Sequence, residues 1–166
     1  MNQKEKQSIF EELLARSRGR LAAVAGAYAY GDADDLLQEI LLQIWRSLST
    51  FKGDSSIDTW SYRVAINTAL TWRRTKIRRK KWIPSEVSNL NELPTTESGH
   101  DSANLLEQLD QFLQTLSKKD RALVLLYLDD VSGKEMAEIT GQSEGAIRVR
   151  IHRIKQKLSD WKAGDQ

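Results

Sequence analysis

The sequence contains no cysteine, which excludes a disulfide framework and any metal site built on thiolate ligands. It contains only two histidines, His100 and His152, and two isolated histidines cannot form a zinc cluster by themselves. We therefore expect no metal ion and no other cofactor.

Long hydrophobic runs are missing as well. The longest apolar run, from Leu123 to Leu128, is far too short to cross a bilayer, and the first ten residues are polar rather than signal-like. The chain also lacks a Gly-rich phosphate loop, a paired nucleophile and base, and a cluster of metal ligands. These absences predict a cytoplasmic protein that does not insert into membranes, has no small-molecule substrate and is not an enzyme.

Charged residues of both signs are present in nearly equal numbers, but they are unevenly distributed. The formal net charge is +2 at pH 7, yet residues 63–81 hold eight basic side chains and no acidic one. Between Trp82 and Ser117 the pattern reverses, with acidic side chains and no Lys or Arg. Both prolines, Pro84 and Pro94, fall in this second stretch. We interpret residues 83–102 as a flexible acidic linker between a first domain, 1–82, and a second domain, 103–166.

Apolar periodicity predicts helices in both domains, so the expected fold class is all-α, with two small helical domains. In the first domain, helical spacing covers residues 9–25 and 36–48, and a third helix is expected over 57–79. Gly31 ends the first pattern, and Asp32 can cap the second helix by accepting from unpaired backbone N–H groups. Segments 105–116 and 122–128 are also helical in pattern, with Ser117 as the cap between them.

The segment from Ser132 to Leu158 has the layout of a helix-turn-helix, with Gly141 and Gln142 at the turn. On the second helix, one face is apolar and is expected to be buried, with Ile147, Ile151, Ile154 and Leu158. The opposite face carries Gly145, Val149, His152, Arg153 and Gln156, flanked by Arg148, Arg150, Lys155 and Lys157. Such a face suits a DNA major groove, because flanking cations can meet phosphates while central side chains reach base edges. The alternative is a solvated basic helix that closes a helical bundle.

A second candidate for DNA binding lies in the first domain. The basic run from Arg73 to Lys81, with Trp72 and Trp82 beside it, could follow a phosphate backbone. A run of charge can equally be a solvated helix face. The presence of two independent candidates across one linker favours DNA binding.

Three segments resemble, in the same order along the chain, the regions of bacterial RNA polymerase sigma factors. Residues 34–45, beginning Asp34, Asp35, Leu36, Leu37, Gln38, Glu39, resemble region 2.2, which docks on the polymerase clamp. Residues 51–74 resemble regions 2.3 and 2.4, which open and read the −10 element, and residues 116–153 are similar to region 4, which reads the −35 element. No region 1.1 or helical region 3 is visible, which places the resemblance in the extracytoplasmic-function group of the sigma-70 family.

The resemblance implies an alternative sigma factor that binds core RNA polymerase and promoter DNA and directs transcription initiation. It implies a polymerase-binding role for Asp35, Gln38 and Glu39. It implies contacts to the −10 element by Arg63, Asn67, Arg73, Arg74 and Lys76, and contacts to the −35 element by Arg148, Val149, His152 and Arg153. An anti-sigma factor is a further partner that the resemblance allows.

A different function class remains open at this point. An ordinary helix-turn-helix transcription regulator, whose first domain senses a ligand or dimerises, needs neither the basic third helix nor the surface from Asp35 to Glu39. Such a regulator should bind a DNA duplex alone. A sigma factor of this kind should bind promoters well only together with core polymerase.

Overall fold

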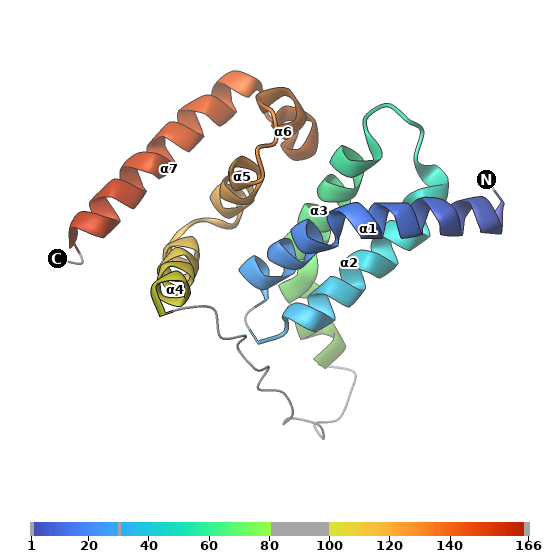
Figure 1. Cartoon of the computed structure of the whole chain (residues 1–166), viewed down its shortest axis with the longest axis horizontal. Coiled ribbons are helices and arrows are strands. Elements are labelled where there is room, and N and C mark those ends of the chain that lie inside the picture. The colour runs from blue at the N-terminus through green and yellow to red at the C-terminus, as the bar shows by residue number, and fades with distance from the viewer. Residues whose placement is uncertain (1, 30, 81–99, 165–166) are drawn as a thin grey trace.

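The computed structural model describes residues 2–29, 31–80 and 100–164, and every regular element within them is helical (Figure 1). Side chains are described for residues 2–29, 31–72 and 105–163. The elements are α1 (Gln3–Tyr28), α2 (Ala33–Ser47), the short 3₁₀ helix η1 (Leu48–Thr50), α3 (Ile57–Lys80), α4 (His100–Thr115), α5 (Lys118–Leu128), α6 (Gly133–Thr140) and α7 (Glu144–Gly164). The all-α prediction is confirmed.

Local sequence features mark both ends of α1. Asn2 and Glu5 form a capping box in which each side chain accepts from the other's backbone N–H at 2.8 Å. After α1 ends at Tyr28, Gly31 has a φ of +72°, a left-handed conformation that other residues resist. The break predicted at Gly31 therefore lies in the turn that leads into α2.

Asp32 stands at the N-cap position of α2, but its side chain makes no capping hydrogen bond, so the predicted capping bond is wrong. Its backbone, with φ −123° and ψ 22°, lacks the extended conformation that aims a capping side chain at the first turn. Asp34 and Asp35 remain in that turn, where the helix dipole favours negative charge. The predicted apolar stripe is confirmed at its centre, since Leu36, Ile40 and Ile44 are buried.

Helices α1, α2 and α3 pack against one another to form the first half of the molecule. Trp60 is 7% exposed and belongs to the core, and the centroid of its ring lies 5.3 Å from that of Phe51. Trp45 is only partly buried and packs edge-on against Phe10, with ring centroids 5.2 Å apart. The rings of these two aromatic pairs contact each other with the edge-on or tilted geometry that aromatic rings favour.

Helices α4 to α7 form the second half. Ser117 caps α5 as predicted, because its hydroxyl accepts from the backbone N–H of Asp120 at 3.1 Å. Helix α4 begins at His100, so residues 100–102 are helical although we assigned them to the linker. Helix α7 continues past the expected end at Leu158, because Trp161 packs on Phe112 with ring centroids 5.9 Å apart. The rest of the predicted linker, 83–99, lies outside the described residues.

The two halves contact each other directly. Helix α1 contacts α4 and α5, and α6 contacts α3. In Figure 1, α6 lies near the N-terminal end of α3. Helix α5 lies between α7 and the first half. The buried residues of both halves belong to one hydrophobic cluster.

Candidate nucleic-acid and partner-binding surfaces

Three local features determine where the helices of the helix-turn-helix begin and end. Ser132 and Glu135 form a capping box at the start of α6, and the pKa of the Glu135 carboxyl is lowered by hydrogen bonds from the Ser132 hydroxyl and backbone. Gly141, with φ +69°, then ends α6 in the left-handed conformation. The Ser143 hydroxyl accepts from the backbone N–H of Ala146 at 3.3 Å and starts α7.

Helix α7 has the two faces that its sequence predicts. Ile147 and Ile154 are 2% and 6% exposed, and Ile151 and Leu158 are partly buried. On the opposite face Val149 is 51% exposed, and the other three residues expected to read the −35 element are also exposed: Arg148, His152 and Arg153. The structure therefore brings these four candidates together on one accessible surface.

Two cations that we placed on the flanks of this surface are engaged within the protein. Arg150 is half-buried and binds Asp120 and Gln142, so it does not project as a free phosphate ligand. Lys155 donates to the Tyr127 hydroxyl at 2.7 Å and lies 4.3 Å from the centre of that ring. Lys157 is exposed.

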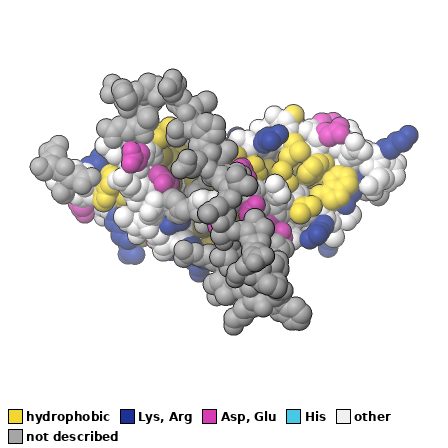
Figure 2. Space-filling model, turned by 90° about the horizontal axis from the view of Figure 1, so that it is seen from below, with side chains coloured by type: hydrophobic (Ala, Val, Ile, Leu, Met, Phe, Trp, Pro, Cys, Tyr) yellow, Lys and Arg dark blue, Asp and Glu magenta, His cyan; other side chains and the backbone are white. Residues whose placement is uncertain are grey.

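The candidate polymerase surface lies on the solvent side of α2. Asp35 and Gln38 are exposed, whereas Glu39 is half-buried and accepts from the Gln43 amide at 3.0 Å. Leu42, which we did not single out from the sequence, is 46% exposed. It follows Asp35 by seven residues and Gln38 by four, so the helical repeat puts it on the same face. Figure 2, seen from below, shows hydrophobic side chains gathered at the end of the molecule formed by the first half.

On α3 the structure describes two of the five candidate contacts to the −10 element. Arg63 and Asn67 are both exposed and lie one helical turn apart. The backbone of Arg73, Arg74 and Lys76 continues α3, but their side chains are outside the described set. The basic run therefore follows Arg63 and Asn67 along the same helix.

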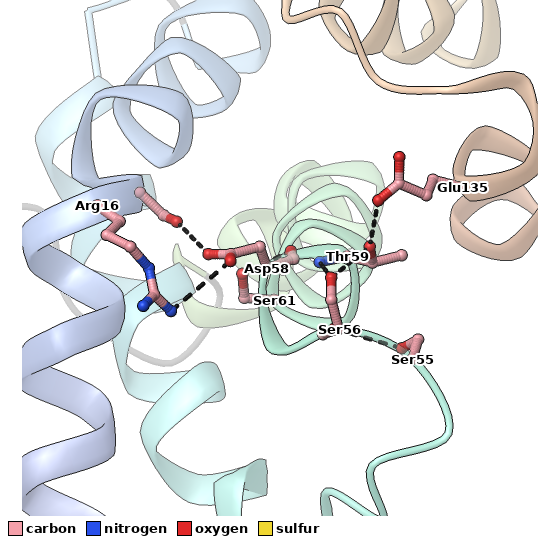
Figure 3. Close-up of polar contacts among 8 residues, drawn as sticks. Arg16, Ser55, Ser56, Asp58, Thr59, Ser61 and Glu135 are labelled. Carbon is pink, nitrogen blue, oxygen red and sulfur yellow. Dashed lines mark hydrogen bonds and ion pairs between the residues drawn. The ribbon is translucent and has the colours of Figure 1, made fainter.

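The start of α3 is held by polar contacts from both halves (Figure 3). Ser17 donates to the Asp58 carboxylate at 2.9 Å, and Arg16 lies 3.6 Å from the same side chain. On the other side of the helix, the Thr59 hydroxyl donates to Oε1 of Glu135 at 3.1 Å. Sequence patterns had not suggested this contact, because it joins residues that are 76 positions apart.

Within the described residues there is no group of three or more His, Asp or Glu side chains placed to hold a metal ion. None of the helices described is long and apolar enough to cross a membrane. The arrangement is one of exposed basic and polar helix faces, which can bind charged macromolecules.

Comparison with known families identifies both halves. The sigma-70 region 2 model matches residues 13–82, and the sigma-70 region 4 model matches residues 106–158. The chain is 31% identical to the ECF RNA polymerase sigma-E factor of Escherichia coli K12 over 172 aligned positions, which cover 95% of the chain and 88% of that protein. It is 26% identical to the Haemophilus influenzae sigma-E factor, covering 91% and 86%.

Two solved structures share the arrangement of helices. CnrH in complex with the cytosolic domain of CnrY has a TM-score of 0.70 and 23% identity, covering 96% of this chain and 91% of CnrH. The Bartonella quintana sigma factor RpoE, in complex with the anti-sigma factor NepR, has a TM-score of 0.71 and 22% identity, covering 95% and 98%. Both likenesses concern the fold.

Proposed function

Because this chain belongs to the sigma-70 family, and within it to the extracytoplasmic-function group, we propose that it is an alternative sigma factor with two DNA-reading surfaces and one polymerase-binding surface. The observation that carries the proposal is the order of the family matches, with region 2 on α1–α3 and region 4 on α4–α7. An ordinary helix-turn-helix regulator is not favoured, since it needs no region 2. The proposed domains are 1–82 and 103–166, and the first turn of α4, from His100, extends the second domain by three residues.

The polymerase-binding surface is the solvent face of α2. Asp35, Gln38 and Glu39 offer carboxylate and amide oxygens to basic groups on core polymerase, and such charge complementarity steers association and fixes register. Leu42 adds an apolar side chain among them, whose burial against the polymerase would strengthen the contact.

The −10 element is read from α3. Asn67 and Arg63 are placed to contact bases that leave the duplex, and capture of such bases helps to hold the open strand. Arg73, Arg74 and Lys76 follow on the same helix and neutralise phosphates. The −35 element is read by Arg148, Val149, His152 and Arg153 from the exposed face of α7.

We propose that the chain itself catalyses no reaction. We also propose that it acts in the cytoplasm, where core polymerase and the chromosome are found. Since the structural relatives CnrH and RpoE were solved with CnrY and with the anti-sigma factor NepR, we also propose an anti-sigma factor as a partner. Such a partner would regulate the chain by binding it.

Run-off transcription tests the proposed function. Core RNA polymerase is supplied with the promoter of this protein's own gene, with and without the chain, and with a promoter whose −10 and −35 elements are scrambled. We expect a defined transcript only when the chain and the intact promoter are both present. Tight binding of the chain to duplex DNA, with no stimulation of core polymerase, would instead support the regulator.

A further inference from the structure

Arg150 is fully engaged although it belongs to the helix that reads DNA. Its Nε and Nη2 lie 3.2 and 3.1 Å from Oδ1 of Asp120, and its Nη1 donates to Oε1 of Gln142 at 2.9 Å. The Arg150 and Asp120 side chains are 32% and 16% exposed, so the pair is largely shielded from water. A planar guanidinium with each of its nitrogens occupied fixes orientation better than a single charge does.

The partners of Arg150 are held in turn by other elements. The Ser117 hydroxyl donates to Oδ2 of Asp120 at 2.7 Å, which fixes that carboxylate at the start of α5. Gln142 lies in the turn between α6 and α7. Arg150 therefore ties α7 to α5 and to the turn, at a position directly after the exposed Val149.

We propose that Arg150 is a positioning residue for reading the −35 element, which sets the rotation of α7 about its own axis and does not contact DNA. This inference rests on the proposed function. Base contacts by Arg148 and Arg153 require alignment with base edges, so a small rotation of α7 misplaces both side chains.

Asp120→Asn separates positioning from phosphate contact, because the two roles predict opposite signs. If Arg150 bound phosphate, the substitution would release it and remove a negative charge, so promoter binding by the holoenzyme would tighten. As a positioning residue, Arg150 loses its partner, so promoter binding should weaken several-fold and base preference at the −35 element should broaden. The measurements are holoenzyme affinity for the promoter and transcription from a randomised −35 library.

Salt dependence and coupling supply independent readouts. Promoter affinity falls as salt rises, and loss of one phosphate contact makes the slope of log affinity against log salt less steep by about 0.9. Arg150→Gln should leave this slope unchanged, because Arg150 is proposed not to contact DNA. Asp120→Asn and Arg150→Gln should not be additive, since they break one network. Gln142→Ala gives a milder variant if either fails to fold, as judged by thermal unfolding. Tighter binding or an unaltered −35 preference in folded Asp120→Asn, with a parent holoenzyme that transcribes, would overturn the inference. A parent that does not transcribe would reject the proposed function instead.

Discussion

At the scale of single residues, we expect the exposed side chains of α7 to form two groups, those that face base edges and those that meet phosphates. His152 and Arg153 lie on the exposed face opposite Ile147 and Ile154, and Lys157 lies exposed nearby. Arg153→Ala or His152→Ala should reduce transcription from the cognate promoter and alter preference at particular −35 positions, because a bidentate Arg–guanine contact is worth about 1–3 kcal/mol of discrimination. A randomised −35 library transcribed by each variant holoenzyme measures the change.

Lys157→Ala is the matched control for these variants. A phosphate contact carries no sequence information, so its loss should lower activity on all promoters alike and flatten the salt dependence. If Arg153→Ala and Lys157→Ala both keep the parent's sequence preference, α7 does not read bases in the orientation described.

At the scale of elements, the polar face of α2 lies opposite the side chains that α2 buries in the core. Replacing Asp35, Gln38 and Glu39 together with Ala should weaken binding to core polymerase, since it removes the charge complementarity of that face. Thermal unfolding should change little, because surface substitutions usually fall within about 0.5 kcal/mol. Binding is measured by titration of labelled chain with core polymerase.

A triple variant on α1 controls for the loss of surface charge itself. Gln7, Glu11 and Glu12 are exposed and also comprise one amide and two carboxylates. Their replacement with Ala should leave core binding unaltered. Equal losses in the two triple variants would show that the α2 face has no particular role.

Two glycines near the start of α7 should respond in opposite ways when they are replaced with Ala: one variant should be less stable than the parent and the other more stable. Gly141 has φ +69° and nothing within 4 Å of an added Cβ, so Gly141→Ala should cost about 1 kcal/mol through backbone strain alone. Gly145 lies inside α7 with equally open surroundings, so Gly145→Ala should raise the free energy of unfolding by up to about 1 kcal/mol. Urea unfolding of both variants measures the difference, and a stabilising Gly141→Ala would contradict the left-handed turn.

At the scale of the whole molecule, the halves should be separable despite their contacts. Each half has its own buried residues, such as Leu36 and Ile40 in the first and Leu123 and Leu126 in the second. Limited proteolysis should cut first within residues 83–99, and fragments 1–82 and 100–166 should each show helical circular dichroism and cooperative unfolding. Two unfolded fragments would mean that each half depends on the other for its core.

Local patterns predicted much of the fold because helices form from contacts close in sequence. The stripe of Leu36, Ile40 and Ile44 follows the helical repeat, and Ser117 caps α5 through its near neighbour Asp120. Two of these predictions were wrong, one because of local backbone geometry and the other because of a tertiary contact. Asp32 has the right side chain but the wrong backbone angles, and α7 extends to Trp161 because Phe112 packs there from α4.

The sequence by itself determined the helices, the division of charge between the two faces of α7, and the order of regions that identifies the family. These properties depend on side chains within a few turns of one another, where periodicity and capping act. Only the tertiary structure decided that Arg150 binds Asp120, that Arg121 of α5 donates to the Ala27 carbonyl of α1, and that Thr59 donates to Glu135. Such contacts join residues from about thirty to more than ninety positions apart, and no periodic pattern encodes a hydrogen bond whose partners are brought together only by packing.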